Sequence, residues 1–490
     1  MAKCGLCINT NRTELPKNLN EIRFYYLTPK ELLKSAQQGC RACLMIRDGI
    51  QFFEALGSSQ TSINRISGFS RHPDKSLLVQ LELGDEDRPS HIVLEFVPRQ
   101  PKPRTPNTST SSLPWARSHL EKCSRNHEYC GTIAQYQPST SFITSVNSDL
   151  AISRKSETTL PTRVLDLGQP GEETVNLLET ENSMIGRYIC LSHCWGQKQP
   201  IVTTKDTIKS WKKEIPLALI PRMFQDAIAF TRDLQIRYLW IDCLCIIQDD
   251  SHDWQQQAGR MAQIYQNSYV TLAATSSQDY DRGLFHQFEP RSEMYVLKGL
   301  DPSRKNFDIY VQKRRPHWTD KYTHRDVFLH AEFPLMTRAW VYQERLLAPR
   351  VLHFCLEELV WECNEELACQ CGSFNPPGKS KNVKNLHADI LHKLQAQKFS
   401  PPPRKFIKDL DAAEEESNSD VLIEKWNDLV SDYLKLEITY DRDRLPALAG
   451  LAERMQRLRK DNYVAGLWEN DLLKSLCWWV SRQEPSLPMP

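Results

Sequence analysis

The feature that most restricts the fold of this chain is an alternation of short apolar runs with helical patterns. Ile185–Cys194 is a short, apolar, β-rich run, and Tyr238–Ile247 is apolar on both faces apart from Asp242. A strand covered by helices on both sides requires such runs, which are too short for typical helices. Between them, Pro221–Leu234 spaces its apolar residues at helical intervals and begins with proline. We predict a strand–helix–strand unit.

The alternation continues, because Asp253–Tyr265 has a helical pattern and Tyr269–Thr275 resembles another strand. Strands and helices in this order and of these lengths indicate right-handed βαβ units and a parallel sheet. The predicted fold class is therefore α/β, with α+β and helical regions beside the core. Further segments are predicted downstream: a helix at Trp340–Leu347, a hairpin of Val351–Cys355 and Leu359–Cys363, and helices at Val421–Leu436 and Ala447–Arg459.

At 490 residues the chain is long enough for two to four compact units. We expect an N-terminal cysteine-containing region at 1–135, a core domain at 184–350 and a C-terminal extension at 351–490. Residues 98–113 are rich in proline, serine and threonine, which predicts a disordered linker. Residues 372–419 are rich in proline, lysine, glutamate and serine, and we interpret them as a flexible insertion.

The balance of charge argues against a nucleic-acid partner, since 62 Lys+Arg face 61 Asp+Glu. No stretch of 18 apolar residues predicts a membrane span, and Met1–Asn11 lacks a signal-peptide pattern. Several of the 15 cysteines lie inside apolar runs, where thiols behave as small hydrophobic side chains in a reducing compartment. We therefore expect a cytoplasmic protein.

Two cysteine pairs near the N-terminus have the spacing of zinc ligands, Cys4 with Cys7 and Cys40 with Cys43. The gap between the pairs is longer than usual for a four-thiolate site. The alternative, which we favour, is that Cys40 and Cys43 face a helix core while the terminal pair is exposed. The candidate zinc ligands are therefore Cys4, Cys7, Cys40 and Cys43, whereas Cys123 and Cys130 are expected to be buried or half-buried thiols rather than ligands.

Candidate site residues occur at two places, at the end of the first predicted strand and inside the second. Ser192, His193, Trp195 and Gly196 end the first strand, and ligands of open parallel sheets bind beyond the carboxyl ends of strands. A packed turn explains these four residues equally well. Asp242 lies among apolar residues, so its carboxylate either has a buried partner, such as the backbone, Arg232 or Arg237, or faces a cleft.

Several blocks of the chain resemble the heterokaryon-incompatibility (HET) domain of filamentous fungi. They occur in the expected order over about a hundred residues: Tyr188–Gly196, Leu219–Ile228, Ile236–Gln248 and Met261–Tyr265. Thr337–Leu347 resembles the tail block of these proteins, and smaller similarities follow at Trp361–Cys363, Leu445–Gly450 and Ala465–Trp468. The resemblance implies a role in self/non-self recognition, innate immunity and programmed cell death.

The same resemblance implies a TIR-like or flavodoxin-like parallel sheet, and some TIR domains hydrolyse NAD with a glutamate beside the strand ends. By this analogy a nucleotide would be bound by Ser192, His193, Trp195, Gly196 and Trp240, with aromatic rings stacking on the base. A carboxylate would stabilise the oxocarbenium-like ribose as nicotinamide leaves. NAD would then be a substrate, and apart from the candidate zinc ion the residues identify no cofactor.

The resemblance also places the catalytic acid in doubt. HET domains usually read Asp-Trp-x-x-Glu in the helix after the second strand, whereas this chain has Gln257 at the glutamate position. The amide cannot carry the charge. The candidate catalytic residues are therefore Asp242, Gln257 and Glu344. Asp253 is equally suited to a helix N-terminus, and Glu344 to pairing with Arg345 or Arg350 on a solvated face.

Two hypotheses of function follow. The first is a signalling module of incompatibility that associates with itself or with protein partners, which the glutamine at position 257 favours. The alternative is a TIR-like NAD hydrolase. A hydrolase that uses Ser192 and His193 together is disfavoured, because adjacent strand residues point to opposite faces.

Overall fold

The structure is a computed structural model that describes most, but not all, of the chain. The described residues are Cys4, Ile22, 24–56, 63–69, 77–83, 90–97, 109–127, Cys130, 157–181, 184–196, 201–285, 294–298, 308–313, His317, 332–371 and 411–476.

The chain folds into two compact units, and the first is made from two separate segments. Unit 1 comprises Met1–Pro106 and Phe288–Arg325, and unit 2 comprises Asn107–Gln287 and Asp326–Pro490. The residues after 107 that we assigned to the N-terminal region therefore fold with the second unit.

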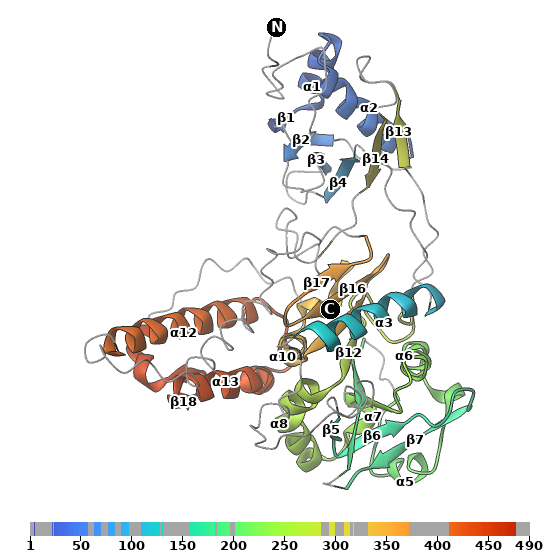
Figure 1. Ribbon diagram of the computed structural model, residues 1–490, viewed down its shortest axis with the longest axis vertical. Helices are drawn as coiled ribbons and strands as arrows, with labels where there is room; N and C mark the ends of the chain where they lie inside the picture. The colour runs from blue at the N-terminus through green and yellow to red at the C-terminus, as the bar shows by residue number, and fades with distance from the viewer. Residues whose placement is uncertain are drawn as a thin grey trace, which may run out of the picture. The chain divides into compact units, whose positions relative to one another are not determined.

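Unit 1 is a six-stranded antiparallel sheet in the order β1-β2-β3-β4-β14-β13, with two helices packed on it (Figure 1). Its strands are β1 (Phe24–Leu27), β2 (Ile63–Phe69), β3 (Leu77–Leu83), β4 (Ser90–Val97), β13 (Met294–Leu297) and β14 (Ile309–Lys313). Its helices are α1 (Pro29–Gln37), which begins with a capping box of Thr28 and Glu31, and α2 (Arg41–Leu56). Gly49 lets α2 approach the sheet closely, since a Cβ there would lie 2.7 Å from the Phe96 ring.

Unit 2 is built on a nine-stranded mixed sheet in the order β10-β7-β6-β11-β9-β12-β15-β16-β17. Its strands are β6 (Arg163–Asp166), β7 (Thr174–Glu179), β9 (Tyr188–Ser192), β10 (Ile215–Pro216), β11 (Tyr238–Ile241), β12 (Val270–Ala273), β15 (Arg350–Phe354), β16 (Leu359–Cys363) and β17 (Leu367–Cys369). Two small sheets pair β5 (Thr158–Thr159) with β8 (Ile185–Gly186) and β18 (Tyr463–Val464) with β19 (Leu467–Trp468).

The centre of this sheet is parallel, as the apolar runs predict. Strand β9 pairs in parallel with β11 on one side and with β12 on the other, and β12 pairs in parallel with β15. The α/β prediction is therefore confirmed, although antiparallel strands extend the sheet at both ends, with β6 against β11 and β16 against β15. The predicted hairpin is the β15–β16 pair.

Helices cover both faces of the sheet (Figure 1). The chain runs from β9 through α6 to β11 and then through α8 to β12 on the opposite side of β9, so right-handed crossovers place α6 and α8 on opposite faces. Helix α6 contacts α3, while α8 contacts α10 and α13. The helices are α3 (Ser109–Asn126), α5 (Ile208–Trp211), α6 (Arg222–Asp233), α7 (Asp242–Cys245), α8 (Ser251–Asn267), α10 (Ala339–Leu347), α12 (Asp411–Tyr433), α13 (Pro446–Arg459) and α14 (Leu472–Ser475).

Some predicted boundaries differ from those of the structure. The strand expected to continue to Ile247 ends at Ile241, because the next four residues coil into α7. Of the expected linker, residues 98–108 lie outside the described residues and α3 begins at Ser109. Of the expected insertion, residues 372–410 lie outside them and α12 begins at Asp411.

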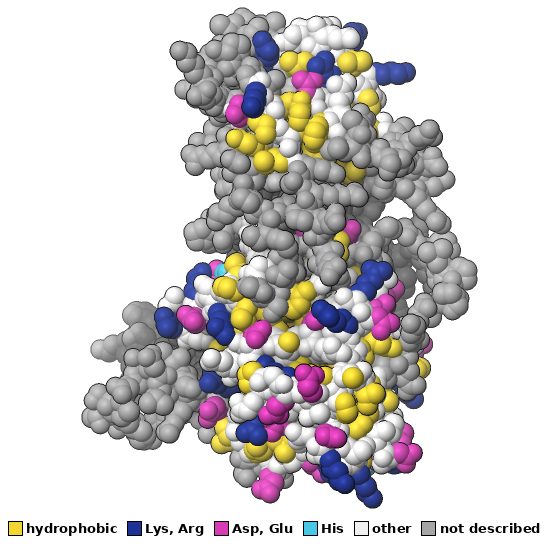
Figure 2. Space-filling view, turned by 90° about the vertical axis from the view of Figure 1, so that its right-hand side faces the viewer, with side chains coloured by type: hydrophobic (Ala, Val, Ile, Leu, Met, Phe, Trp, Pro, Cys, Tyr) yellow, Lys and Arg dark blue, Asp and Glu magenta, His cyan; other side chains and the backbone are white. Residues whose placement is uncertain are grey.

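No helix among the described residues is both long and apolar enough to cross a membrane. On the face shown in Figure 2, basic and acidic side chains are interspersed over the described surface, in keeping with the near-zero net charge. Such a mixture of charges does not favour long-range attraction of a polyanion to the described part of this face.

Candidate functional site

The candidate site lies where the parallel strands β9 and β11 end. Ser192 is the last residue of β9, and Asp242 directly follows β11. The register pairs Leu191 with Ile241, so the residues after them emerge at the same edge of the sheet. The chain runs from β9 to β11 on one side and then from β11 to β12 on the other side of β9. Open parallel sheets form ligand sites at the carboxyl ends of the strands where the strand order reverses in this way.

Asp242 is the centre of a small hydrogen-bonded group. Its Oδ2 accepts a bond of 2.8 Å from the Trp195 indole nitrogen, and its Oδ1 accepts one of 2.7 Å from the backbone nitrogen of Cys243. The side chain is 24% exposed. The carboxylate is therefore neither buried without a partner nor paired with Arg232 or Arg237, two of the partners that the sequence suggested, since those guanidinium groups contact Leu167 and Asp166.

His193 lies between Asp242 and α6, with its Nδ1 3.7 Å from Asp242 Oδ1 and its ring edge against Phe224. Burial lowers the pKa of the imidazole, the Asp242 charge opposes this, and the Arg338 charge adds to it. His193 Nε2 is buried and has no hydrogen-bond partner among the described residues. A neutral imidazole with a proton on Nδ1 would leave Nε2 as an acceptor.

Glu344, on α10, contacts Ser192, the last residue of β9. Its Oε2 accepts a hydrogen bond of 2.6 Å from the Ser192 hydroxyl. Burial raises the pKa of the Glu344 carboxyl to about 7, the bond from Ser192 opposes the rise, and the Asp242 charge adds to it. The alternative placement on a solvated face is wrong, since the side chain is buried and Arg345 pairs with Glu362.

Two residues near Glu344, Tyr265 and Arg338, were not identified as candidates from the sequence. The Tyr265 hydroxyl donates to the Leu191 carbonyl oxygen at 3.4 Å, and its polarity also lowers the pKa of the Glu344 carboxyl. The Arg338 charge lowers the pKa of both Glu344 and His193. Both residues lie within blocks that resemble the HET domain, at Met261–Tyr265 and Thr337–Leu347. The blocks were thus the available signal, but nothing in them indicates which side chain turns toward Ser192.

Ser192 and His193 have different partners, Glu344 and Asp242, and they do not form a serine–histidine pair. Trp195 is half-buried on Asp242, and Gly196 is exposed in a left-handed conformation with φ of 71°. A side chain at position 196 would meet the Cβ of Asp279 at 2.8 Å. The strand-end cluster, which is Ser192, His193, Trp195, Asp242 and Glu344, is therefore assembled from three separate segments.

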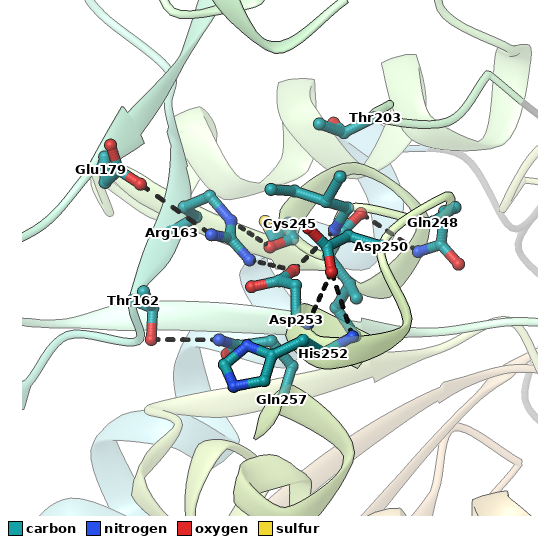
Figure 3. A network of polar contacts seen from close by, with 12 residues as sticks. Thr162, Arg163, Glu179, Thr203, Cys245, Gln248, Asp250, His252, Asp253 and Gln257 are labelled. Atoms are coloured by element: carbon teal, nitrogen blue, oxygen red, sulfur yellow. Dashed lines mark hydrogen bonds and ion pairs between the residues drawn. The ribbon is translucent and has the colours of Figure 1, made fainter. Parts of the chain in front are cut away.

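Asp253 and Gln257 belong to a different network, shown in Figure 3. Asp253 Oδ2 accepts bonds from Arg163 at 2.5 Å and from the backbone nitrogen of Ile247 at 2.8 Å. Gln257 is buried, and its amide lies 3.4 Å from the Thr162 hydroxyl. Trp240 is also buried, with its ring edge-to-face on Tyr265. Neither Gln257 nor Trp240 hydrogen-bonds to the strand-end cluster within the described residues.

The N-terminal cysteines lie in unit 1. Cys4, Cys40 and Cys43 are all buried, and their sulfur atoms lie within 4.8 Å of one another. The expectation that Cys4 is exposed is therefore wrong, because its side chain packs in the core of unit 1. Cys7 lies outside the described residues. The zinc site of Cys4, Cys7, Cys40 and Cys43 stays a prediction.

Comparison with known proteins assigns the central part of the chain to a family. Residues 188–344 match the family described as Heterokaryon incompatibility protein (HET). No curated protein and no solved structure matches the chain. The match contains every residue of the strand-end cluster.

Proposed function

We propose that this HET domain acts in fungal self/non-self recognition and in cell death of the incompatibility type, as a cytoplasmic signalling module that binds protein partners or itself. The observation that carries the proposal is the family match over residues 188–344. The small net charge also agrees with a protein partner rather than a nucleic acid.

A second function, hydrolysis of NAD by this domain, is favoured by one specific observation, the buried Glu344 at the strand ends. A carboxyl whose pKa is about 7 titrates at the pH of the cytoplasm, which is the property of many catalytic acids and bases. The order of the parallel strands, with β9 between β11 and β12, is also that of flavodoxin-like sheets, which bind nucleotides at this edge.

In this reaction the bond between ribose C1′ and the nicotinamide nitrogen breaks, and its electron pair leaves with neutral nicotinamide. Water adds to C1′ and releases a proton. Ionised Glu344 would stabilise the positive ribose and accept that proton, while Ser192 orients its carboxylate. Trp195 is half-buried at the site and available for stacking on a base, whereas the buried Trp240 ring is covered by Tyr265.

The first experiment measures nicotinamide release from NAD by the purified full-length protein. If the domain is an NAD hydrolase, Glu344→Gln abolishes release, whereas Asp226→Asn, which alters a buried acid on α6 outside the site, does not. The rate should increase with pH through about 7, because only the ionised carboxylate stabilises the positive ribose. Gln257→Glu should have no effect on the rate, since that side chain faces Thr162.

The second experiment separates the two functions in cells. The full chain is expressed from an inducible promoter in a filamentous fungus, and dye uptake and the NAD pool are followed together. A signalling module kills without prior loss of NAD, and Glu344→Gln still kills. A hydrolase depletes NAD before death, and the same variant is harmless. Absence of death with the parent chain, at a verified protein level, would contradict the proposed role in incompatibility.

A further inference from the structure

Three thiols and one imidazole converge in unit 2, away from the strand-end cluster. Cys123 lies in the last turn of α3, His127 and Cys130 follow it, and Cys363 is the last residue of β16. One ligand atom from each lies within 4.8 Å of all the others. The segment after α3 and the end of β16 are more than 200 residues apart in sequence, since His127 and Cys363 are separated by 236 positions.

We propose that these four residues, called the α3–β16 cluster, bind a structural zinc ion. The chemical set is Cys3His, one of the common ligand sets of structural zinc. The spacing of the first three, Cys-x3-His-x2-Cys, puts Cys123 and His127 one helical turn apart. The sequence alone predicts only buried thiols at Cys123 and Cys130, because Cys363, which completes the set, lies far away in the chain.

The distances agree with a tetrahedral ion. Zinc bonds of about 2.3 Å to sulfur and about 2.0 Å to nitrogen separate neighbouring ligand atoms by about 3.5–3.8 Å. His127 Nδ1 lies 3.3 Å from the Cys363 sulfur and 3.8 Å from the Cys130 sulfur. The three cysteine side chains are 0% exposed, and the His127 side chain is 11% exposed. This is the closed environment of a structural site rather than the open one of a catalytic site.

A buried cation lies against one of the sulfur atoms. Arg350 is 4% exposed, and its positive charge favours the thiolate form of a cysteine that it contacts. Its hydrogen bonds go to the Cys123 sulfur at 3.3 Å and to the Tyr269 carbonyl at 3.1 Å, and no carboxylate contacts it among the described residues. The thiolate form, which Arg350 favours at Cys123, is the form that binds zinc.

The groups around the cluster also match those of known zinc sites. A histidine that binds zinc through one nitrogen usually directs the other toward a carboxylate. Here His127 Nε2 faces Glu366 Oε2 at 3.9 Å, and Lys122 on α3 holds the other oxygen of Glu366 at 2.5 Å. The backbone nitrogen of Glu366 donates to the Cys363 sulfur at 3.3 Å. These contacts orient His127 and Cys363.

The ion would join α3 to the antiparallel end of the large sheet. Helix α3 contacts β16 and α6 (Figure 1). Cys123 and Cys130 belong to the same apolar core as the parallel strands. The site would therefore stabilise the helix that precedes the HET domain against the strand that follows it.

The test measures zinc per chain by elemental analysis in full-length protein purified without chelators or metal affinity. We expect Cys363→Ser to lose about one zinc equivalent per chain. Cys190→Ser, a matched buried cysteine in β9 outside the cluster, should lose none, since its sulfur donates to the Ile264 carbonyl at 3.8 Å and belongs to none of the candidate metal clusters among the described residues. Cys40→Ser reports separately on the thiols of unit 1. Equal zinc in Cys363→Ser and the parent would overturn the proposal.

Because Cys363→Ser can unfold the chain, a second variant keeps four zinc-binding side chains at the cluster. His127→Cys changes Cys3His to Cys4, another common set for zinc. Loaded with Co²⁺, it should keep the metal and gain thiolate charge-transfer absorption, whereas an unfolded chain would lose the tetrahedral spectrum. Retention of an unchanged cobalt spectrum contradicts the proposal. So does a disulfide between two of the three cysteines, detected by mass spectrometry after alkylation without reduction.

Discussion

Two buried carboxylates of the segment that matches the HET family, residues 188–344, lie in opposite electrostatic situations. Asp253 contacts the Arg163 guanidinium and a backbone nitrogen, so its negative charge is compensated where it lies. Glu344 accepts a bond from the uncharged Ser192, and no basic side chain is within ion-pair distance of it among the described residues. A compensated buried charge holds a fold together, whereas an uncompensated one changes its pKa and becomes available for chemistry. The Asp253 network is therefore architecture, and Glu344 is the candidate for function.

The largest effect should come from breaking the compensated pair. Arg163→Ala leaves Asp253 buried without its cation, which should cost about 3–5 kcal/mol of unfolding free energy. Urea denaturation measures it. In Arg163→Met/Asp253→Leu both charges are absent, and most of the loss should be recovered. If Arg163→Ala were as stable as the parent, the ion pair of Arg163 and Asp253 would not stabilise the fold.

At Glu344 we expect a substitution to increase the free energy of unfolding rather than to decrease it. Its folded pKa of about 7 exceeds the usual 4.5, so the folded state binds the proton more tightly and loses stability as pH increases from 4.5 to 7. Glu344→Gln should therefore stabilise the protein at pH 8 by about 3 kcal/mol and leave it nearly unchanged at pH 4.5. Paired denaturation curves at the two pH values measure the difference. A variant that is less stable at pH 8 would show that the carboxylate has an unseen cation.

A smaller loss is expected from the hydrogen bond that orients Asp242. Trp195→Phe removes the indole donor and keeps an aromatic ring, and the bond is to a partly exposed carboxylate. We expect a cost of about 1 kcal/mol in unfolding free energy. Trp254→Phe, on α8, is the matched control, because no hydrogen bond of its indole joins the cluster. Equal losses of unfolding free energy in the two variants would show that the hydrogen bond from Trp195 to Asp242 does not stabilise the cluster.

The smallest effect should be at Gln257. Its contact with Thr162 is long, at 3.4 Å, and Arg260 bonds to the same hydroxyl at 2.9 Å. Gln257→Met keeps the volume and should change the unfolding free energy by less than about 1 kcal/mol. Thermal melting beside the parent measures it. A change comparable to that of Arg163→Ala would make Gln257 part of the essential network.

The sequence predicted the centre of unit 2 because that centre depends on local periodicity. The parallel strands and the helices α6 and α8 each carry their pattern within a few turns. Contacts between distant segments have no such signal. The bond from Ser192 to Glu344 spans 152 positions and that from Arg163 to Asp253 spans 90, so the placement of these groups could not be read from either segment alone. The family blocks indicated which segments matter, but not which side chains meet.

The first unit has a further consequence for synthesis of the protein. Its sheet is completed by β13 and β14, and Gln312 of β14 reaches Glu95 of β4 across 217 positions. During translation, β9, β11 and β12 leave the ribosome before β13 and β14 exist, and until then β4 is an open edge. A premature stop codon between β12 and β14 would therefore release a chain that lacks both β15 of the parallel core and the two strands that cover the edge of β4.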